Sequence, residues 1–371
     1  MKLLVPFGTR PEIIKLAPVV HALRITHDVV TVASGQQRDA AMVEEVCAGL
    51  ELEPSVTWTM PTAASDLLGT LVTAAWRQIE ADAPDAVMVQ GDTSTALAAG
   101  LAARRCGVPV IHLEAGLRSW NERSPEELHR RLLAVAASLH LAPTERAAQA
   151  LRDEGIAPSR VHVVGNSILD GLRLLAVDRR PVRDRRGIVL TAHRPANVDD
   201  PERLRAVVAL AGALVEVGDR VLFPVHPRTR SRLDGALLDA LVDAGVDVVP
   251  PLPWRRMIEA VAGARLVVTD SGGLQEEASW FGVPTVVLRQ STPRPEGVEA
   301  GIAALTGLDV NRALAAAARL LSPSEQERVA DVPCPYGDGH TAERVAALLA
   351  DPGVWSAMTL REPDLRDGPP C

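Results

Sequence analysis

The chain alternates short, apolar, β-branched runs with longer stretches of helical periodicity that are rich in Ala, Leu and Arg. Strands that are apolar throughout belong in a parallel sheet covered by helices on both faces, so the alternation predicts an α/β fold. The predicted strands of the first half are 2–7, 28–33, 86–90, 108–113, 139–142 and 161–164. Those of the second half are 187–191, 221–225, 246–249, 265–269 and 284–288.

The number of strands and the chain length both predict two domains. A chain of 371 residues exceeds the size at which one hydrophobic core stops growing. The two series of strands therefore predict two doubly wound, Rossmann-like domains. Charge rises and apolar periodicity lapses near residues 165–167 or 178–186, where one domain should give way to the next. We expect an N-terminal domain over 1–168, a C-terminal domain over 169–350 and a terminal segment over 351–371.

Charge and cysteine usage narrow the function classes. The net charge of −8 gives no reason to expect nucleic acid or an anionic membrane as a partner. The four cysteines, at positions 47, 106, 334 and 371, lack the spacing of a disulfide framework or a zinc site. The apolar run at the start is too short for a signal peptide, and no later run is long enough to span a membrane. We expect a cytoplasmic protein without a metal.

The stretch from Val267 to Glu277 predicts a seat for a phosphate group. An apolar run ends in Ser271, Gly272 and Gly273, and a helix-like segment follows. Backbone N–H groups and the positive end of the helix would converge there. Glu277, farther along, could accept hydrogen bonds from ribose hydroxyls. The alternative is an ordinary strand-to-helix turn with Ser271 as its N-cap.

Polar residues that directly follow strands are the candidate site, because ligands of doubly wound sheets bind at the carboxyl ends of the strands. If the two domains face each other, these ends line one cleft. The sets that follow strands are Gly8-Thr9-Arg10 with Lys15, Gly91-Asp92-Thr93, Glu114-Ala115-Gly116, His193-Arg194, His226 and the Ser-Gly-Gly turn.

The basic residues of these sets suit an anionic ligand. Arg10 and Lys15 place two cations at a helix start, which predicts a phosphate contact; a surface salt bridge is the alternative. His193-Arg194 could bind and protonate a leaving diphosphate, or could be structural. Arg289 and Arg294 add positive charge near the same end. The first strand is not followed by a dinucleotide or P-loop motif, so no cofactor is expected.

Three carboxylates are candidate acids and bases. Asp92 follows the strand 86–90, although Asp at such a place is also a common N-cap. Glu114 follows an apolar run and precedes Ala-Gly, where a buried carboxylate is available for proton transfer. Ser124 and Glu127 have the spacing of a capping box, which leaves Glu126 for another role. Together Asp92, Glu114 and Glu126 would suit removal and return of a proton at carbon.

Taken in order, these residues resemble the non-hydrolysing UDP-N-acetylglucosamine 2-epimerases. The matches run through most of the chain. They are Phe7-Gly8-Thr9-Arg10-Pro11-Glu12-Ile13-Ile14-Lys15, Gly91-Asp92-Thr93, His112-Leu113-Glu114-Ala115-Gly116-Leu117-Arg118, Ser124-Pro125-Glu126-Glu127, Gly165-Asn166-Ser167, Thr191-Ala192-His193-Arg194, Pro224-Val225-His226, 270–277, Arg294-Pro295-Glu296 and Pro335-Tyr336-Gly337-Asp338-Gly339. The resemblance implies a GT-B-type fold, with two Rossmann-like domains facing across a cleft and the C-terminal helix returning to the first.

The resemblance also implies an activity. In that family UDP leaves C1 together with the C2 proton, giving 2-acetamidoglucal, and then adds back with the proton on the other face. Asp92, Glu114 and Glu126 match the acid–base carboxylates, and His193 matches the histidine on the diphosphate. The residues that match further UDP-sugar contacts are Arg10, Lys15, Arg130, Ser271, Gly272, Gly273, Glu277 and Arg294. A metal-independent homodimer acting on UDP-N-acetylglucosamine is expected.

The chain departs from the family pattern at several places. The loop between Arg118 and Ser124 is shorter than usual and lacks an aromatic residue before Pro-Glu-Glu. Pro195-Ala196 and Gln36-Gln37 stand where the family pattern has other residues. The two regions that contain them resemble the parts of bacterial members that hold a second, activating substrate molecule. A hydrolysing relative that releases N-acetylmannosamine and UDP stays open, as do a member acting on a modified UDP-sugar and a catalytically silent UDP-sugar-binding protein. A glycosyltransferase, which needs no set of three carboxylates, is the weaker alternative.

Overall fold

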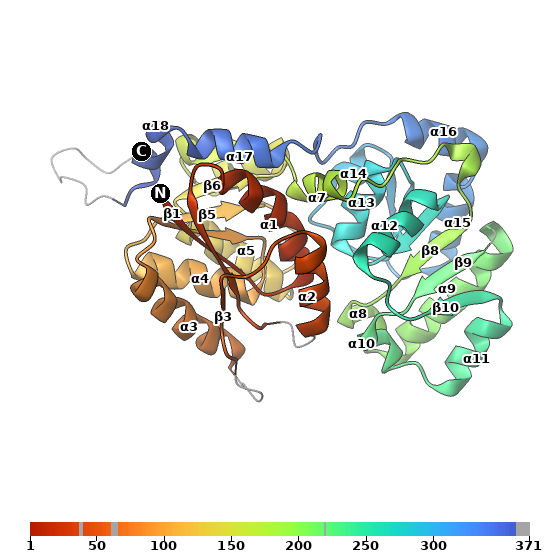
Figure 1. Cartoon of the computed structure of the whole chain (residues 1–371). Helices are drawn as coiled ribbons and strands as arrows, with labels where there is room; N and C mark the ends of the chain where they lie inside the picture. The colour runs from red at the N-terminus through yellow and green to blue at the C-terminus, as the bar shows by residue number, and fades with distance from the viewer. Residues whose placement is uncertain (37–39, 61–65, 219, 361–371) are drawn as a thin grey trace. The chain divides into compact units, whose positions relative to one another are not determined.

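The computed structural model describes residues 1–36, 40–60, 66–218 and 220–360. Within them the chain forms two compact units (Figure 1). Unit 1 contains Met1–Leu174 and the chain from Gly337 onward, and unit 2 contains Leu175–Tyr336. The expected limits of 168 and 350 differ from these, because helix α17 (Thr341–Leu349) packs against helix α1 (Arg10–Leu23) of unit 1. Gln37 and the end of the terminal segment lie outside the described residues.

Unit 1 is built on a seven-stranded parallel sheet in the order β3-β2-β1-β4-β5-β6-β7, counted over the described residues. Every residue of β4, β5 and β6 is buried, which is why these strands read as apolar runs interrupted only by single polar residues. The strands are β1 (Lys2–Phe7), β2 (Asp28–Ala33), β3 (Val56–Thr57), β4 (Ala86–Gln90), β5 (Val110–Leu113), β6 (Leu139–Ala142) and β7 (Val161–Val163).

The helices of unit 1 cover both faces of its sheet (Figure 1). The chain first runs outward from β1 to β3 and then returns to β4, so right-handed crossovers place α1 and α2 on one face and α3, α4 and α5 on the other. Helix α17 packs on the first face, beside α1. Besides α1 and α17, the helices are α2 (Ala40–Gly49), α3 (Leu67–Asp82), α4 (Ser94–Arg105), α5 (Pro125–Ala136), α6 (Glu145–Asp153), α7 (Ser167–Leu175), α18 (Pro352–Met358) and the 3-10 turn Pro158–Arg160.

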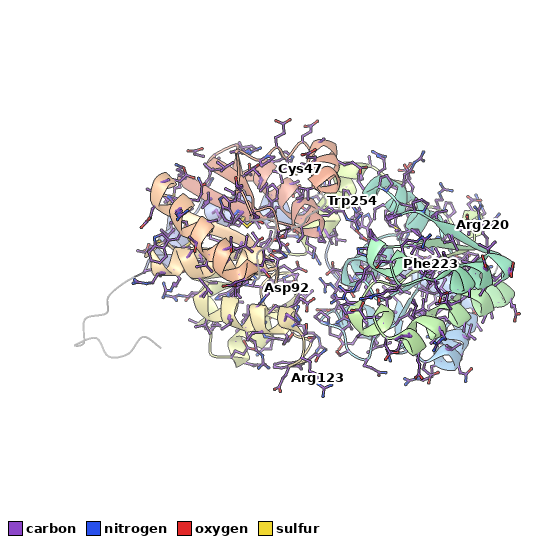
Figure 2. All side chains as sticks on the ribbon, turned by 90° about the horizontal axis from the view of Figure 1, so that it is seen from below. Cys47, Asp92, Arg123, Arg220, Phe223 and Trp254 are labelled. Atoms are coloured by element: carbon purple, nitrogen blue, oxygen red, sulfur yellow. The ribbon has the colours of Figure 1, made fainter. Side chains whose placement is uncertain are left out.

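Unit 2 is built on a six-stranded parallel sheet in the order β10-β9-β8-β11-β12-β13, again within the described part of the chain. Phe223, labelled in Figure 2, lies fully buried in this sheet among aliphatic side chains. The strands are β8 (Ile188–Thr191), β9 (Val221–Pro224), β10 (Val246–Val249), β11 (Leu266–Thr269), β12 (Thr285–Val287) and β13 (Ala303–Leu305).

The helices of unit 2 follow the same winding. Helices α9 and α15 pack together on one face, and α12 packs beside α13. The helices are α8 (Pro195–Val198), α9 (Pro201–Gly218), α10 (Pro227–Arg230), α11 (Gly235–Asp243), α12 (Trp254–Gly263), α13 (Gly272–Trp280), α14 (Glu296–Glu299), α15 (Val310–Leu320), α16 (Pro323–Asp331) and the 3-10 turn Val182–Asp184.

The α/β prediction with two doubly wound parallel sheets is confirmed, and each predicted strand is present with ends shifted by at most a few residues. Two edge strands, β3 and β13, were not predicted. Both are short, and β13 consists of Ala-Ala-Leu, which carries little strand preference. Across the described ranges, no helix combines the length and the hydropathy that a bilayer crossing requires.

The tightest backbone approach in unit 1 yields a stability prediction. Gly116 has φ = +88°, and a Cβ there would lie 2.1 Å from the carbonyl oxygen of Ala147 on α6. Gly155 has nearly the same φ, +86°, but a Cβ there would meet nothing within 4 Å. Gly155→Ala should therefore cost only the strain of a left-handed residue, about 1–2 kcal/mol. Gly116→Ala should cost roughly 2 kcal/mol more, because backbone must move.

Thermal and urea unfolding of the two variants measure this difference. The two glycines form a matched pair, since the backbone strain is shared and only the contacts with Ala147 and Leu151 differ. Equal losses of stability in both variants would contradict the packing described for Gly116.

Candidate active site

Each sheet reverses its strand order once, and several of the candidate residues lie at these two points. In unit 1 the reversal lies between β1 and β4, and in unit 2 it lies between β8 and β11. The loops that leave the carboxyl ends of two such strands diverge to opposite faces and open a crevice between them. These loops carry Arg10 and Asp92 in unit 1, and His193 and Ser271 in unit 2.

In unit 1 the fully buried carboxylate of Glu12 joins the two diverging loops. It accepts hydrogen bonds from the Gly8 backbone N–H (2.9 Å) and the Thr9 hydroxyl (2.9 Å) of the first loop. It also accepts one from the Thr93 hydroxyl (2.6 Å) of the second. Burial raises the pKa of Glu12 to about 7, although these donors act in the other direction. Arg10 lies half-buried at the first position of α1, beside this junction.

Glu114 follows β5 and occupies a strained backbone position. Its φ is 65°, in the left-handed region that non-glycine residues seldom adopt and that costs about 1–3 kcal/mol. Its buried carboxylate accepts from Lys15 Nζ at 2.6 and 2.7 Å and from Gln90 Nε2. A Cβ on Gly91 would lie 3.6 Å from Glu114 Oε2, so this carboxylate lies close to the loop of Asp92.

Asp92 pairs with Arg130 of α5, and Arg130 also donates to Glu127 Oε2 at 2.7 Å. Glu127 is buried and accepts in addition from the backbone N–H and the hydroxyl of Ser119, each at 2.8 Å. Burial alone would raise the pKa of Glu127, but the hydrogen bonds from Ser119 and Arg130 hold it below its usual value. The predicted capping box is therefore wrong: Ser124 makes no side-chain cap, and Glu127 supports Arg130 instead.

The other N-cap alternatives are also resolved. Thr93, not Asp92, caps α4, because its hydroxyl accepts from the Ala96 N–H at 3.0 Å. The Asp92 carboxylate is thereby left for Arg130. Ser271 does occupy the N-cap position of α13, but its hydroxyl makes no cap hydrogen bond.

Glu126 lies half-buried in the first turn of α5, and its Oε2 accepts from the Ser124 hydroxyl. The structure thus brings Asp92 and Glu114 to neighbouring strand ends with their cations, while Glu126 contacts its own loop. Its approach to the other two carboxylates stays a prediction.

Two buried histidines lie behind these carboxylates on paired strands. His112 of β5 and His140 of β6 are register partners. His112 Nε2 donates to the Gly91 carbonyl at 2.8 Å, which supports the turn before Asp92. Within the described residues, neither ring nitrogen of His140 has a hydrogen-bond partner. Burial lowers the pKa of His112 to about 4 and that of His140 to about 3.

In unit 2 the fully buried carboxylate of Asp270 joins the ends of β8 and β11. It accepts from the backbone N–H groups of His193 (3.0 Å) and Arg194 (2.9 Å) and from the side-chain amide of Asn197 (3.0 Å). His193 Nδ1 lies 3.1 Å from its Oδ1. Burial alone would raise the pKa of Asp270, but the hydrogen bond and charge of His193, with the other donors, hold it below its usual value.

This arrangement orients His193. Because Nδ1 faces Asp270, the other ring nitrogen, Nε2, is directed away from the carboxylate. The ring is about one-third exposed, and its centroid lies 5.2 Å from that of His226. With a proton on each ring nitrogen, His193 would keep its bond to Asp270 and present Nε2–H as a donor to an anion next to the β8 end.

The predicted phosphate seat begins α13. Gly272 and Gly273 are its first two residues, so their N–H groups belong to the unpaired first turn of the helix. A Cβ on Gly272 would lie 2.8 Å from a guanidinium nitrogen of Arg294, so this arginine lies directly beside the helix start. A Cβ on Gly273 would meet nothing within 4 Å, so this side of the turn is open. Arg294 is held by a charged hydrogen bond to Glu276.

Glu277 lies one helical turn beyond Gly273 on the same face of α13. Its Oε1 accepts from the indole N–H of Trp254 at 3.1 Å. Trp254 is the first residue of α12 and is labelled in Figure 2. Both side chains are buried.

Sequence reasoning assigned no role to four residues that organise the site, Glu12, Asn197, Trp254 and Asp270, and it assigned a capping role to a fifth, Glu127. The rule that selected Asp92, a polar residue directly after a strand, also selects Asp270. No local signal marks Trp254, since its partner is distant in sequence. The described residues contain no group of His, Cys, Asp or Glu side chains suited to a metal ion.

Comparison with known proteins gives one consistent answer. The profile of the family described as UDP-N-acetylglucosamine 2-epimerase matches residues 21–350. A probable UDP-N-acetylglucosamine 2-epimerase of Ralstonia nicotianae is 36% identical, over 94% of this chain and 98% of that protein.

Solved structures agree. The UDP-GlcNAc 2-epimerase of Neisseria meningitidis bound to UDP-GlcNAc is 30% identical with a TM-score of 0.86, over 94% of this chain and 100% of that chain. The enzyme of Methanocaldococcus jannaschii in complex with UDP-GlcNAc and UDP is 34% identical with a TM-score of 0.85, over 94% and 99%.

The buried histidines predict an acid-sensitive fold. Between about pH 6.5 and pH 4 an unfolded chain binds protons on His112 and His140 that the folded chain does not, so the free energy of unfolding should fall as the pH falls. Each histidine contributes up to about 1.4 kcal/mol per pH unit in that range. In the His140→Leu variant the free energy of unfolding should therefore fall less steeply with decreasing pH than in the parent chain.

Urea unfolding at several pH values between 7 and 4.5 measures both curves. The carboxylates titrate in both proteins, so the difference between the curves isolates His140. Parallel curves would contradict a neutral, buried His140.

Proposed function

The chain belongs to the UDP-N-acetylglucosamine 2-epimerase family, and we propose that it interconverts UDP-N-acetylglucosamine and UDP-N-acetylmannosamine without releasing UDP. The observation that carries the proposal is the pair of carboxylates at neighbouring strand ends of unit 1, each held by a cation: Glu114 by Lys15 and Asp92 by Arg130. The complexes of relatives with UDP-GlcNAc support the choice of substrate.

The reaction has a chemical obstacle that explains what the site must supply. The C2–H bond of the sugar has no neighbouring carbonyl to acidify it. Elimination avoids this difficulty: the C2–H bond breaks, its electron pair forms the C1=C2 double bond, and the C1–O bond to UDP breaks. The intermediate is 2-acetamidoglucal. UDP then adds back to C1 while a proton returns to C2 on the opposite face, which inverts C2.

Unit 1 is proposed to move the protons. Glu114 and Asp92, with Glu126, are the candidates to remove the C2 proton and to return one to the other face. Lys15 and Arg130 fix the first two carboxylates, and the left-handed backbone of Glu114 sets its direction. Carboxylates that are fixed in this way lower the activation barrier, because the entropic cost of orienting them is met before the substrate reacts.

Unit 2 is proposed to hold the UDP. The first turn of α13, with Ser271, Gly272 and Gly273, would seat a phosphate, and Arg294 beside Gly272 would add positive charge. His193, oriented by Asp270, would donate to the diphosphate and stabilise it as it leaves C1. Arg10 of unit 1 is a further phosphate contact in this proposal. Glu277 would accept from the ribose hydroxyls.

We also propose that the protein is a homodimer that associates through α5. Leu128, Leu132 and Val135 recur at helical spacing on one exposed face of this helix, whose opposite face carries the buried Arg130 and Leu133. An exposed apolar stripe of this kind is typical of a surface that another protein covers. A second copy of the chain is the simplest partner, because a two-fold interface pairs the same surface with itself.

Proton NMR with UDP-N-acetylglucosamine in D2O tests the function. We expect UDP-N-acetylmannosamine to appear with deuterium at C2 and with UDP still attached, because the proton lost in elimination exchanges with solvent before re-addition. Free UDP with N-acetylmannosamine would identify a hydrolysing enzyme. No exchange, together with saturable UDP binding, would identify a binding protein.

The same experiment tests Glu114. Glu114→Gln should leave UDP binding intact and slow turnover by roughly 10²- to 10⁴-fold, the usual contribution of a general acid or base. Glu145→Gln, at an exposed position of α6, is the matched control and should behave as the parent. Equal loss of UDP binding and turnover in Glu114→Gln would show a structural role instead.

Analytical ultracentrifugation tests the dimer. Leu132→Glu should shift the protein toward monomer, because a charge would be buried in the apolar contact. Val242→Glu, at an exposed position of α11 in unit 2, should not change the mass. A parent protein that sediments as a monomer would refute the proposal.

A further inference from the structure

Trp254 and Glu277 form a buried pair, and the role proposed above for Glu277 leaves Trp254 without a function. The indole N–H donates to Glu277 Oε1 at 3.1 Å, and each residue is only 7% exposed. A buried indole N–H needs an acceptor, and a carboxylate makes the bond stronger than a neutral acceptor would. The two residues lie 23 positions apart and belong to different helices, α12 and α13. The bond therefore fixes the direction of the Glu277 carboxylate from outside its own helix.

The position of Glu277 on α13 relates the direction of its carboxylate to the predicted phosphate seat. Gly273 and Glu277 are four residues apart, so they lie on the same helix face about one turn, or ~5–6 Å, from each other. The Gly273 side is the open side of the phosphate seat. A nucleoside diphosphate seated there by its phosphates would carry its ribose along this face toward Glu277. A carboxylate suits two neighbouring hydroxyl groups, because its two oxygens can accept a hydrogen bond from each.

We propose that Trp254 is a positioning residue: its indole N–H holds the Glu277 carboxylate in the orientation that accepts the ribose hydroxyls, so that unit 2 selects a ribonucleotide over a deoxyribonucleotide. A glutamate side chain has three rotatable bonds, and fixing them before the ligand arrives lowers the entropic cost of binding. The proposal rests on the proposed function in one respect, the assignment of the α13 seat to UDP. It needs binding alone and does not depend on which reaction follows.

Isothermal titration calorimetry with UDP and with 2′,3′-dideoxy-UDP tests the role. In Trp254→Phe the affinity for UDP should fall about tenfold, as expected for the loss of a hydrogen bond to a charged group. The affinity for 2′,3′-dideoxy-UDP should be unchanged, since that ligand has no hydroxyls for Glu277 to accept. Trp355→Phe removes an indole N–H that donates to the Leu349 carbonyl in unit 1, and it should change neither affinity.

A double-variant comparison gives the second test. If Trp254 acts through Glu277, adding Trp254→Phe to Glu277→Gln should weaken UDP binding no further. Additive losses would overturn the proposal, as would equal weakening for UDP and the dideoxy ligand, because both describe a merely structural tryptophan. Should Trp254→Phe fold poorly, replacement of Trp254 by 3-benzothienylalanine exchanges the N–H for sulfur at nearly constant size, and the same two ligands decide.

These outcomes are distinguishable from a failure of the proposed function. If the protein binds UDP with the predicted dependence on the ribose hydroxyls but does not epimerise the sugar, the role of Trp254 holds and the proposed reaction is refuted. If the protein epimerises the sugar but its UDP binding does not depend on the ribose hydroxyls, the proposed reaction holds and the role of Trp254 is refuted.

Discussion

One buried carboxylate at each reversal of strand order holds the candidate site together. Where neighbouring parallel strands send their loops to opposite faces, the first N–H groups of those loops need acceptors away from water. Glu12 meets this need in unit 1 by joining Gly8 and Thr9 to Thr93, and Asp270 meets it in unit 2 by joining His193 and Arg194 to the end of β11. Of the residues proposed to touch substrate, His193 contacts Asp270 directly, and Arg10 and Asp92 are next in sequence to Thr9 and Thr93, which donate to Glu12.

The two units use buried charge for different purposes. In unit 1 the pairs Lys15–Glu114 and Arg130–Asp92 keep two carboxylates in place. Both partners of the Lys15–Glu114 pair are buried, so breaking that pair would leave an uncompensated charge and cost about 3–5 kcal/mol. In unit 2 the Asp270 carboxylate orients the ring of His193, and the Glu277 carboxylate accepts a hydrogen bond from Trp254. The start of α13, which favours an anion, lies close to both in sequence. Proton transfer suits the first arrangement, and retention of a diphosphate suits the second.

The ends of β4 and β5 in unit 1 combine backbone strain with close approach. Glu114 is left-handed, Gly91 and Gly116 have positive φ, and Gly116 lies against the backbone of α6. Such backbone is tolerated where the surrounding contacts over-determine it, and here those contacts are Lys15, the buried strands and α6. The terminal part of the chain adds a further tie in unit 1, because Asp170 of α7 accepts from the Ala342 N–H at the start of α17.

The sequence by itself determined the α/β class, the two parallel sheets, the positions of every strand except the edge strands β3 and β13, and the order of candidate residues. The reason is that buried strands of a parallel sheet are apolar throughout and that ligands of such sheets bind at the strands' carboxyl ends. Asp92, Glu114, His193 and the Gly272-Gly273 turn were found in this way. Only the tertiary structure decided which partner each of them has. Glu127 had the spacing of a cap yet contacts Ser119 and Arg130, and Trp254 donates to Glu277 from another helix. Such pairs join residues that are brought together by packing, so the spacing of residues along the chain does not contain them.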